Sequence, residues 1–291
     1  MKFKSKVLNF RPFLQKPIYN LLTGRFKSKI KGQGMYFEEI ATYHYGDDVR
    51  NIDWKLTSKF KTPYIRRFTE EKERPLIIVI DLFSTMFFGS TEKFKSALAA
   101  EIASLVYWKT LENGDPIGAC VLNDTQNEYL VPTRSTTKSL RILKEISLHC
   151  NRLNKKSIDT KNEVLAKRLK SLDYSIKNNS LVVFISDFLS FDEESKSILK
   201  NLAHRNELVG VRISDKFERE PLANTPSLVI SNGDSQIFLN SNNTILNEDY
   251  ARLYENEFLS ISETFKRLQA PLIEVNTQED LFNQLQQVTN G

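Results

Sequence analysis

Two aspartates, Asp81 and Asp187, stand at the ends of apolar runs that are typical of buried strands. Ligands of open α/β sheets bind outside the carboxyl ends of the strands, so acids at these positions are the first candidates for a site. Asp81 is followed closely by Ser84 and Thr85, which brings a carboxylate and hydroxyls into one tight turn. Carboxylates and hydroxyls are oxygen ligands that a hard cation such as Mg²⁺ accepts.

A further oxygen ligand is available in the loop that holds Thr136 and Thr137, with Asp187 approaching from the neighbouring strand. The aspartates also have a simpler interpretation, in which they only cap the turns or helices that follow their strands. Spacing alone leaves both interpretations open.

A second concentration of acids lies in the segment GDDVRNIDW, which contains Asp47, Asp48 and Asp53. One hypothesis makes these three carboxylates ligands of a catalytic metal in a hydrolase such as a nuclease, with Lys55 nearby. His44 is the histidine nearest to them in the sequence.

The same segment also has a purely structural interpretation. Gly46 would permit a turn, Asp47 or Asp48 would cap a short helix, and Arg50 would pair with an acid. Trp54 would pack inward. This interpretation needs no ligand.

The elements that position these residues follow from the hydrophobic pattern. From Pro75 onward, short apolar runs alternate with amphipathic segments, as in a parallel sheet covered on both faces. The predicted strands are 75–81, 117–122, 128–132, 181–187, 208–213, 227–231, 236–240 and 272–275. The second and third of these could pair as a hairpin, as could the sixth and seventh around Asn232-Gly233.

Helices are predicted between these strands from apolar spacing and capping signals. They cover 91–111, a segment begun by Thr136 or Thr137, one begun by Thr160, one begun by Ser190, 247–268, and one begun by Thr277. We therefore expect a mostly parallel α/β sheet over residues 75–291, preceded by an N-terminal extension over residues 1–74. Cys120 and Cys150 fall in core segments, so we expect buried free thiols.

The N-terminal arm, Met1 to Lys31, holds nine Lys and Arg residues and no acid, while the rest of the chain holds 32 basic and 36 acidic residues. The arm could be a solvated flank packed by its apolar residues, or it could dock on an acidic protein or an anionic membrane face. Docking on a membrane leaves open a further function, that of a purely structural scaffold held at the membrane by the arm. Nucleic-acid binding is not expected, because no reader module accompanies the charge.

The chain has no apolar stretch of about 18 residues, and its N-terminus lacks the apolar core of a signal peptide. We therefore expect a cytoplasmic protein, with the arm as a point of peripheral contact with the inner membrane. The sequence contains no serine nucleophile elbow, phosphate-binding Gly loop or zinc-ligand spacing, and its histidines are scattered. We expect a protein that is not an enzyme.

The string DLFSTMFFGS, preceded by GDDVRNIDW and followed by ISDF, resembles the bacterial family called domain of unknown function 58. The similarity extends from Gly32 to the C-terminus. Members of that family resemble von Willebrand factor A domains, which implies a Rossmann-like sheet. The resemblance also implies a metal-ion-dependent adhesion site, in which D-x-S-x-S, a loop threonine and a later aspartate hold Mg²⁺ or Mn²⁺.

The resemblance matches Asp81 to the leading aspartate, Thr85 to the second hydroxyl and Asp187 to the later aspartate. Thr133, Thr136 and Thr137 are all within reach as the loop threonine, and Thr137 is preferred because it best begins the helix. Phe83 stands where the motif has its first serine, and a phenyl ring cannot ligate a metal. The resemblance therefore implies a degenerate site, where partner binding could persist without Mg²⁺ or Mn²⁺.

The resemblance also implies partners, namely a MoxR-type AAA+ ATPase and envelope proteins with von Willebrand A domains. We accordingly predict a protein-interaction module in which the carboxyl edge of the sheet, with Ser84 beside the metal-site residues, binds an acidic group of a partner. The segment GDDVRNIDW, residues 46–54, is hereafter called the hallmark segment of the family and supplies further partner-binding candidates: Asp47, Asp48, Arg50, Asp53 and Trp54.

Overall fold

The computed structural model describes residues 36–69, 74–90, 93–125, 127–153, 161–189, 191–219, 227–231, 236–240 and 244–290. The chain divides into two compact units, a small one over Phe26–Glu73 and a large one over Met1–Arg25 and Arg74–Gly291. The basic arm lies outside the described residues.

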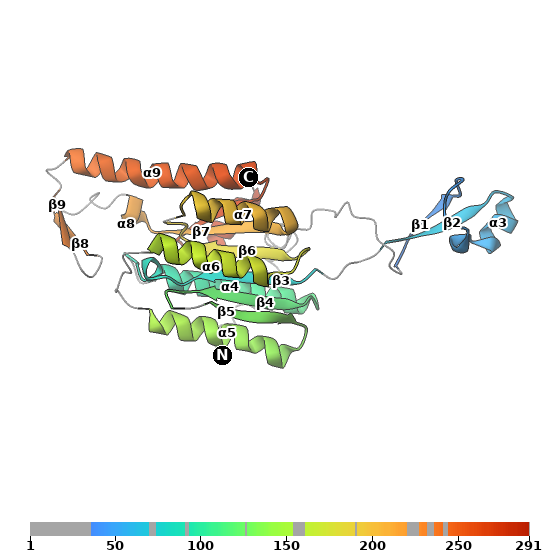
Figure 1. Cartoon of the computed structure of the whole chain (residues 1–291), viewed down its shortest axis with the longest axis horizontal. Helices are drawn as coiled ribbons and strands as arrows, with labels where there is room; N and C mark the ends of the chain where they lie inside the picture. The colour runs from blue at the N-terminus through green and yellow to red at the C-terminus, as the bar shows by residue number, and fades with distance from the viewer. Residues whose placement is uncertain are drawn as a thin grey trace. The chain divides into compact units, whose positions relative to one another are not determined.

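The large unit is built on a six-stranded sheet with the strand order β10-β7-β6-β3-β4-β5 (Figure 1). The strands are β3 (Leu76–Asp81), β4 (Ile117–Leu122), β5 (Glu128–Thr133), β6 (Leu181–Ser186), β7 (Glu207–Ser214) and β10 (Leu272–Asn276). All neighbouring strands are parallel except β5, which runs antiparallel to β4 at one edge. This doubly wound order confirms the predicted von Willebrand A-like fold.

The central strands are apolar along their whole length because helices cover both of their faces. Every residue of β3, β4 and β6 is buried. Side chains alternate along a strand, so Ile78 and Ile80 enter one core and Ile77 and Val79 enter the other.

Each core is closed by its own set of helices. The first contains side chains of α4 (Lys95–Glu112), α5 (Thr136–Arg152) and α10 (Leu281–Asn290), and the second those of α6 (Lys161–Ser175), α7 (Glu193–Arg205) and α9 (Thr244–Arg267). A short helix, α8 (Lys216–Arg219), follows β7. Among the described residues, no helix combines the length and the apolar character needed to cross a membrane.

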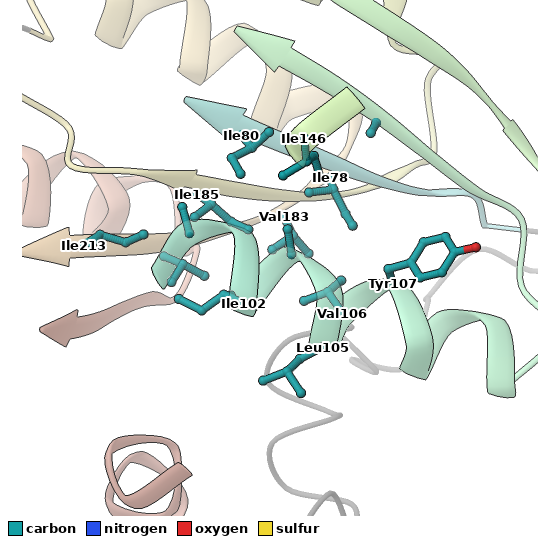
Figure 2. Close-up of a cluster of buried hydrophobic side chains, with 14 of the residues drawn as sticks. Ile78, Ile80, Ile102, Leu105, Val106, Tyr107, Ile146, Val183, Ile185 and Ile213 are labelled. Atoms are coloured by element: carbon teal, nitrogen blue, oxygen red, sulfur yellow. The ribbon is translucent and has the colours of Figure 1, made fainter. Parts of the chain in front are cut away.

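Figure 2 shows the first core, where Ile102 and Val106 of α4 lie against strand residues such as Val183. At the periphery of this core, the hydroxyls of Tyr107 and Ser139 are 2.9 Å apart, and both residues are buried. The hydrogen bond links α4 to α5 and gives the buried Tyr107 hydroxyl a partner, while the Ser139 hydroxyl also donates to the carbonyl of Thr136 at 3.1 Å.

Several helices begin at other residues than the sequence predicted. α4 begins at Lys95 rather than at Thr91. Thr91 lies outside the described residues, as do Thr160 and Ser190, which were predicted to begin two other helices. Aspartate and serine side chains nearer the first turn serve as caps, as expected from their short reach to backbone amides. The caps are Ser135 for α5, Asp192 for α7 and Asp280 for α10.

The hairpin predicted near the C-terminal third is present. β8 (Ser227–Ser231) pairs antiparallel with β9 (Gln236–Asn240), as predicted, while the Asn232-Gly233 turn lies outside the described residues. Both cysteines are free thiols: Cys120 is buried, as predicted, whereas Cys150 is only partly buried.

The small unit contains an antiparallel pair, β1 (Tyr36–Thr42) and β2 (Tyr64–Thr69). Between these strands lie a 3-10 helix, Val49–Asn51, and the helix α3 (Trp54–Phe60). An isolated bridge joins Ile52 to Ile65, which is buried.

Candidate functional site

Asp81 lies at the carboxyl end of the central strand and is completely buried. Its Oδ1 accepts a hydrogen bond from the backbone N–H of Phe83 at 2.9 Å, and its Oδ2 accepts one from the Ser186 hydroxyl at 2.7 Å. Ser186 is the last residue of β6, so this bond joins the ends of two neighbouring strands. Both oxygens of Asp81 therefore have donors within the protein.

Asp187 directly follows β6 and is also buried. Its Oδ1 accepts a hydrogen bond from the backbone N–H of Leu189 at 3.0 Å, and its Oδ2 lies 2.9 Å from the ammonium nitrogen of Lys95. The backbone of Phe188 between these residues has a φ of +54°, in the left-handed region that non-glycine residues seldom adopt. The ring of Phe188 is fixed among Phe184, Phe191 and Phe265.

Lys95, the first residue of α4, is completely buried and contacts a second carboxylate. Its ammonium lies 2.5 Å from Oε1 of Glu218, which belongs to α8. Burial alone would lower the pKa of Lys95, but the negative charges of Asp187 and Glu218 outweigh it and raise that pKa above its ordinary value. Lys95 is therefore a fixed cation at neutral pH.

Asp215, which follows β7, is a third buried acid at the same edge of the sheet. It accepts hydrogen bonds from the backbone N–H of Ser90 at 2.9 Å, from the Ser90 hydroxyl at 2.6 Å and from the backbone N–H of Phe217 at 2.8 Å. The hydroxyl of Thr277, after β10, also donates to it. Burial by itself would raise the pKa of Asp215. The hydrogen-bond donors outweigh burial and hold that pKa below its ordinary value.

The turn after Asp81 departs from the arrangement that the resemblance implied. Phe83 is completely buried in the second core, so the aromatic ring at the ligand position points into the protein interior. Ser84 and Thr85 are partly buried and form a 3-10 turn with Met86.

Thr137 lies near the amino ends of the parallel strands, whereas Asp81 lies at a carboxyl end. β5 is antiparallel to β4, and its last residue, Thr133, pairs with Ile117 at the start of β4. Thr137 is exposed in the first turn of the helix that follows. The structure therefore brings Asp81, Thr85 and Asp187 to one edge but does not bring Thr137 to them.

The side chains at this edge do not fit a divalent-cation site. The oxygens of Asp81 and Asp187 already accept hydrogen bonds, Phe83 supplies no ligand, and Lys95 introduces a positive charge where a metal would have to bind. Among the described residues, no three His, Cys, Asp or Glu side chains are grouped so that they could hold a metal ion.

In the hallmark segment, each aspartate is bound to nearby protein groups. Asp47 accepts from the backbone N–H of His44 at 2.8 Å, and Asp48 caps the 3-10 helix by accepting from that of Arg50 at 3.0 Å. Capping by Asp48 agrees with the structural interpretation of this segment.

Asp53 has the largest set of partners in the hallmark segment. Its Oδ1 caps α3 through the backbone N–H groups of Lys55 and Leu56, both at 3.1 Å, and its Oδ2 accepts from the guanidinium of Arg66 at 2.8 Å. The hydrogen bond from Arg66 and those from the backbone lower the pKa of Asp53 below its ordinary value. Asp53 thus ties α3 to β2.

Trp54 does not pack inward as the structural interpretation expected, because 69% of its surface is exposed. Other large apolar side chains close to Trp54 in the sequence are also exposed, namely Tyr45, Val49 and Phe60.

Three residues of the carboxyl edge were missed from the sequence. Asp215 could have been found, since VRISD repeats the pattern of an apolar strand followed by aspartate that marked Asp81 and Asp187. Lys95 and Glu218 carry no such signal. A charged residue on a predicted helix, such as Lys95, is normally expected in solvent, and no helix was predicted around Glu218.

The chain is similar to several known proteins. An uncharacterized protein of Mycobacterium tuberculosis is 24% identical over 261 residues, which is 89% of this chain and 80% of the relative. Among solved structures, the hypothetical protein BatB from Bacteroides thetaiotaomicron has a TM-score of 0.44 at 12% identity, covering 75% of this chain and 96% of BatB. The SpRpn10 VWA domain has a TM-score of 0.38 at 11% identity, covering 74% of this chain and 94% of that domain.

The fold assignment itself rests on the strand order of the sheet. For the family, the model described as protein of unknown function DUF58 matches residues 39–257, which include the hallmark segment and the carboxyl-edge aspartates. The chain therefore belongs to the DUF58 family, as its sequence motifs predicted.

Proposed function

We propose that this protein is a non-enzymatic interaction module and that its partner docks on the hallmark segment of the small unit. The observation that supports this most directly is the exposure of Trp54, Phe60, Tyr45 and Val49 within one short stretch of chain. Tryptophan and tyrosine are the side chains that most often dominate binding energy at protein interfaces. Their neighbours Arg50, Lys55 and Lys59 add positive charge, which favours a partner with acidic groups around an apolar centre.

The partner that the family resemblance implies is a MoxR-type AAA+ ATPase, acting together with envelope proteins that carry von Willebrand A domains. We propose that ATPase as the first partner to test. Because the carboxyl-edge carboxylates are occupied by internal donors, the proposed contact does not depend on Mg²⁺ or Mn²⁺ held between Asp81 and Asp187.

The test is to measure binding of the MoxR-type ATPase from the same organism to the wild-type chain and to three single variants. Trp54→Ala and Phe60→Ala should each weaken binding by about tenfold or more, as expected for interface anchors. Tyr174→Ala, which removes an exposed aromatic ring from α6 in the large unit, is the matched control and should leave the Kd nearly unchanged. Absence of wild-type binding would refute the partner, and equal binding by Trp54→Ala would refute the surface.

Catalysis is tested separately with phosphodiester substrates in the presence of Mg²⁺ or Mn²⁺. We expect no turnover, because Asp47, Asp48 and Asp53 each bind nearby backbone amides or Arg66. Turnover that is abolished by Asp48→Asn would instead establish the hydrolase that the sequence left open.

We further propose that the basic arm brings the protein to an anionic membrane face. Its charge supports this, with nine Lys and Arg residues and no acid in Met1 to Lys31. Sedimentation with vesicles of anionic lipid should depend on those residues and weaken with salt. Equal sedimentation of the chain with and without the arm would refute this part of the proposal.

A further inference from the structure

The buried lysine at the carboxyl edge has an environment that resembles a cation-binding site. The ammonium of Lys95 lies between Oδ2 of Asp187 at 2.9 Å and Oε1 of Glu218 at 2.5 Å. The ring of Phe88 is 5.8 Å away, measured from the ammonium to the ring centroid, and offers its π face to the positive charge. The backbone N–H of Lys95 donates to the carbonyl of Phe88 at 2.7 Å, which fixes the start of α4 beside the same residue.

This ammonium binds one of the residues that the resemblance implied as ligands of a divalent ion. Asp187 is the residue matched to the later aspartate of the adhesion site, and its Oδ2 is bound to Lys95. Asp81, matched to the leading aspartate, is joined to the same strand end through the hydroxyl of Ser186. The two expected ligands are thus present and adjacent, but the positive charge between the elements comes from the chain itself.

We propose that the Lys95 ammonium is the resident cation of the carboxyl edge and replaces the divalent metal of an adhesion site. The inference concerns the large unit only and does not rest on the partner or the docking surface proposed above.

Two physical arguments support the replacement. Buried carboxylates need compensating charge, and an ammonium with three N–H donors supplies both charge and hydrogen bonds to Asp187 and Glu218. A Mg²⁺ ion would have to lie about 2.1 Å from an oxygen of Asp187, which would place it next to the ammonium and create strong repulsion in a site without water screening. One cation therefore excludes the other.

The replacement also explains how the edge is assembled. Lys95 comes from α4, Asp187 follows β6 and Glu218 comes from α8, so one ammonium links three elements that are distant in sequence. A metal ion would perform this linking role only when bound. The lysine performs it permanently.

The experiment compares Lys95→Ala with Lys95→Met. Both variants lose the charge, but alanine opens a space beside Asp187 and Glu218, whereas methionine fills it. Thermal unfolding and Mn²⁺ binding, the latter by electron paramagnetic resonance, are measured for the wild type and both variants in EDTA, Mg²⁺ and Mn²⁺.

The wild type should show the same unfolding midpoint in EDTA and in Mn²⁺ and should bind no Mn²⁺ at this site. In EDTA, Lys95→Ala should unfold roughly 10 °C lower, because the buried carboxylate of Asp187 and the partly buried carboxylate of Glu218 lose their counter-charge. Lys95→Ala should bind one Mn²⁺ per chain, and its unfolding midpoint should rise part of the way back to the wild-type value when Mn²⁺ is present. Lys95→Met should be destabilised without gaining Mn²⁺, and the double variant Lys95→Ala with Asp187→Asn should lose the gain.

Two results would overturn the inference. One is a wild-type chain that binds one Mn²⁺ and loses it on Asp187→Asn, since lysine and metal would then coexist. The other is a Lys95→Ala chain that binds no Mn²⁺, whether the metal is added to the folded protein or is present during refolding. Neither readout involves the ATPase, so failure here is distinguishable from failure of the proposed function.

Discussion

At the scale of single residues, the carboxyl edge is unusual for the amount of charge it buries. Asp81, Asp187 and Asp215 are all inaccessible to solvent, yet each accepts hydrogen bonds from at least two donors. Buried ionised groups persist only when they are paired and hydrogen-bonded, so this edge depends on donors such as Ser186, Ser90 and Lys95.

The contribution of hydrogen bonds to a buried carboxylate can be measured for Asp215 by following stability as a function of pH. The pKa of Asp215 in the folded protein is below its ordinary value, so its ionised form stabilises the fold at every pH above the unfolded-state pKa. That stabilisation is lost as the pH falls through the folded-state pKa, which lies below about 3.8. We expect Asp215→Asn to lower the free energy of unfolding by about 1–3 kcal/mol near pH 7.

The difference between wild type and Asp215→Asn should narrow as the pH falls below about 4, because the wild-type carboxylate then becomes protonated. Urea unfolding of both proteins over a series of pH values checks this. A difference that stays constant down to acid pH would show that the charge of Asp215 contributes nothing to stability.

At the scale of elements, the antiparallel edge strand depends on a glycine. The register between β4 and β5 shifts at Gly118, and the two strands approach closely there. A Cβ atom at Gly118 would lie 2.7 Å from the carbonyl oxygen of Leu130 and 2.9 Å from the backbone nitrogen of Pro132. Both are backbone atoms of the partner strand, so relief requires β5 itself to move.

Gly118→Ala should therefore lower the free energy of unfolding by about 1–3 kcal/mol through overpacking. Gly210→Ala is the comparison, because a Cβ there would meet only side-chain atoms, of Phe265 at 2.5 Å and Leu272 at 2.7 Å. Side chains can shift where backbone cannot, so the Gly118 variant should be the less stable of the two. Denaturant unfolding of both measures this, and the reverse order would contradict the argument.

At the scale of the whole molecule, the two units have separate structural roles. Among the described residues, the buried residues of both hydrophobic cores begin at Leu76, and the guanidinium of Arg74 pairs with Glu207 inside the large unit. A chain beginning at Arg74 should therefore unfold at nearly the same denaturant concentration as the full chain, with little loss of stability. It should also fail to bind the proposed ATPase partner, because it lacks Trp54 and Phe60.

Circular dichroism during urea unfolding of the two chains checks the first statement, and the ATPase binding assay checks the second. A large loss of stability on removing residues 1–73 would show that the sheet depends on the small unit or on Met1–Arg25, which belongs to the large unit. Retained binding would place the partner contact on the large unit.

The sequence predicted the sheet well because burial on both faces leaves an unmistakable apolar run. Strands such as Leu76–Asp81 and Leu181–Ser186 were found within a residue of their ends. Helix starts were less accurate, since serine and aspartate are frequent before helices and only geometry decides which one reaches the free amides.

The candidate site was predicted only in part. Asp81 and Asp187 are adjacent, as their positions at strand ends required. The prediction that Thr137 joins the site was wrong, although the sequence held the information needed to avoid it. The hairpin predicted for 117–122 and 128–132 makes the second strand antiparallel, so the helix after it begins at the opposite end of the strands from Asp81. Lys95 could not be anticipated, since its burial depends on Asp187 and Glu218, which are distant in sequence.

The position of β3 in the sheet also has a consequence for how the chain folds during synthesis. β3 is the first strand of the sheet to be made, yet one of its neighbours, β6, begins at Leu181, a hundred residues later. Until β6 emerges, the run LIIVI has one unpaired edge and two apolar faces that lack three of their covering helices, α7, α9 and α10. Folding must therefore wait for contacts between distant parts of the chain, and β3 is the segment that most needs protection from aggregation while it waits.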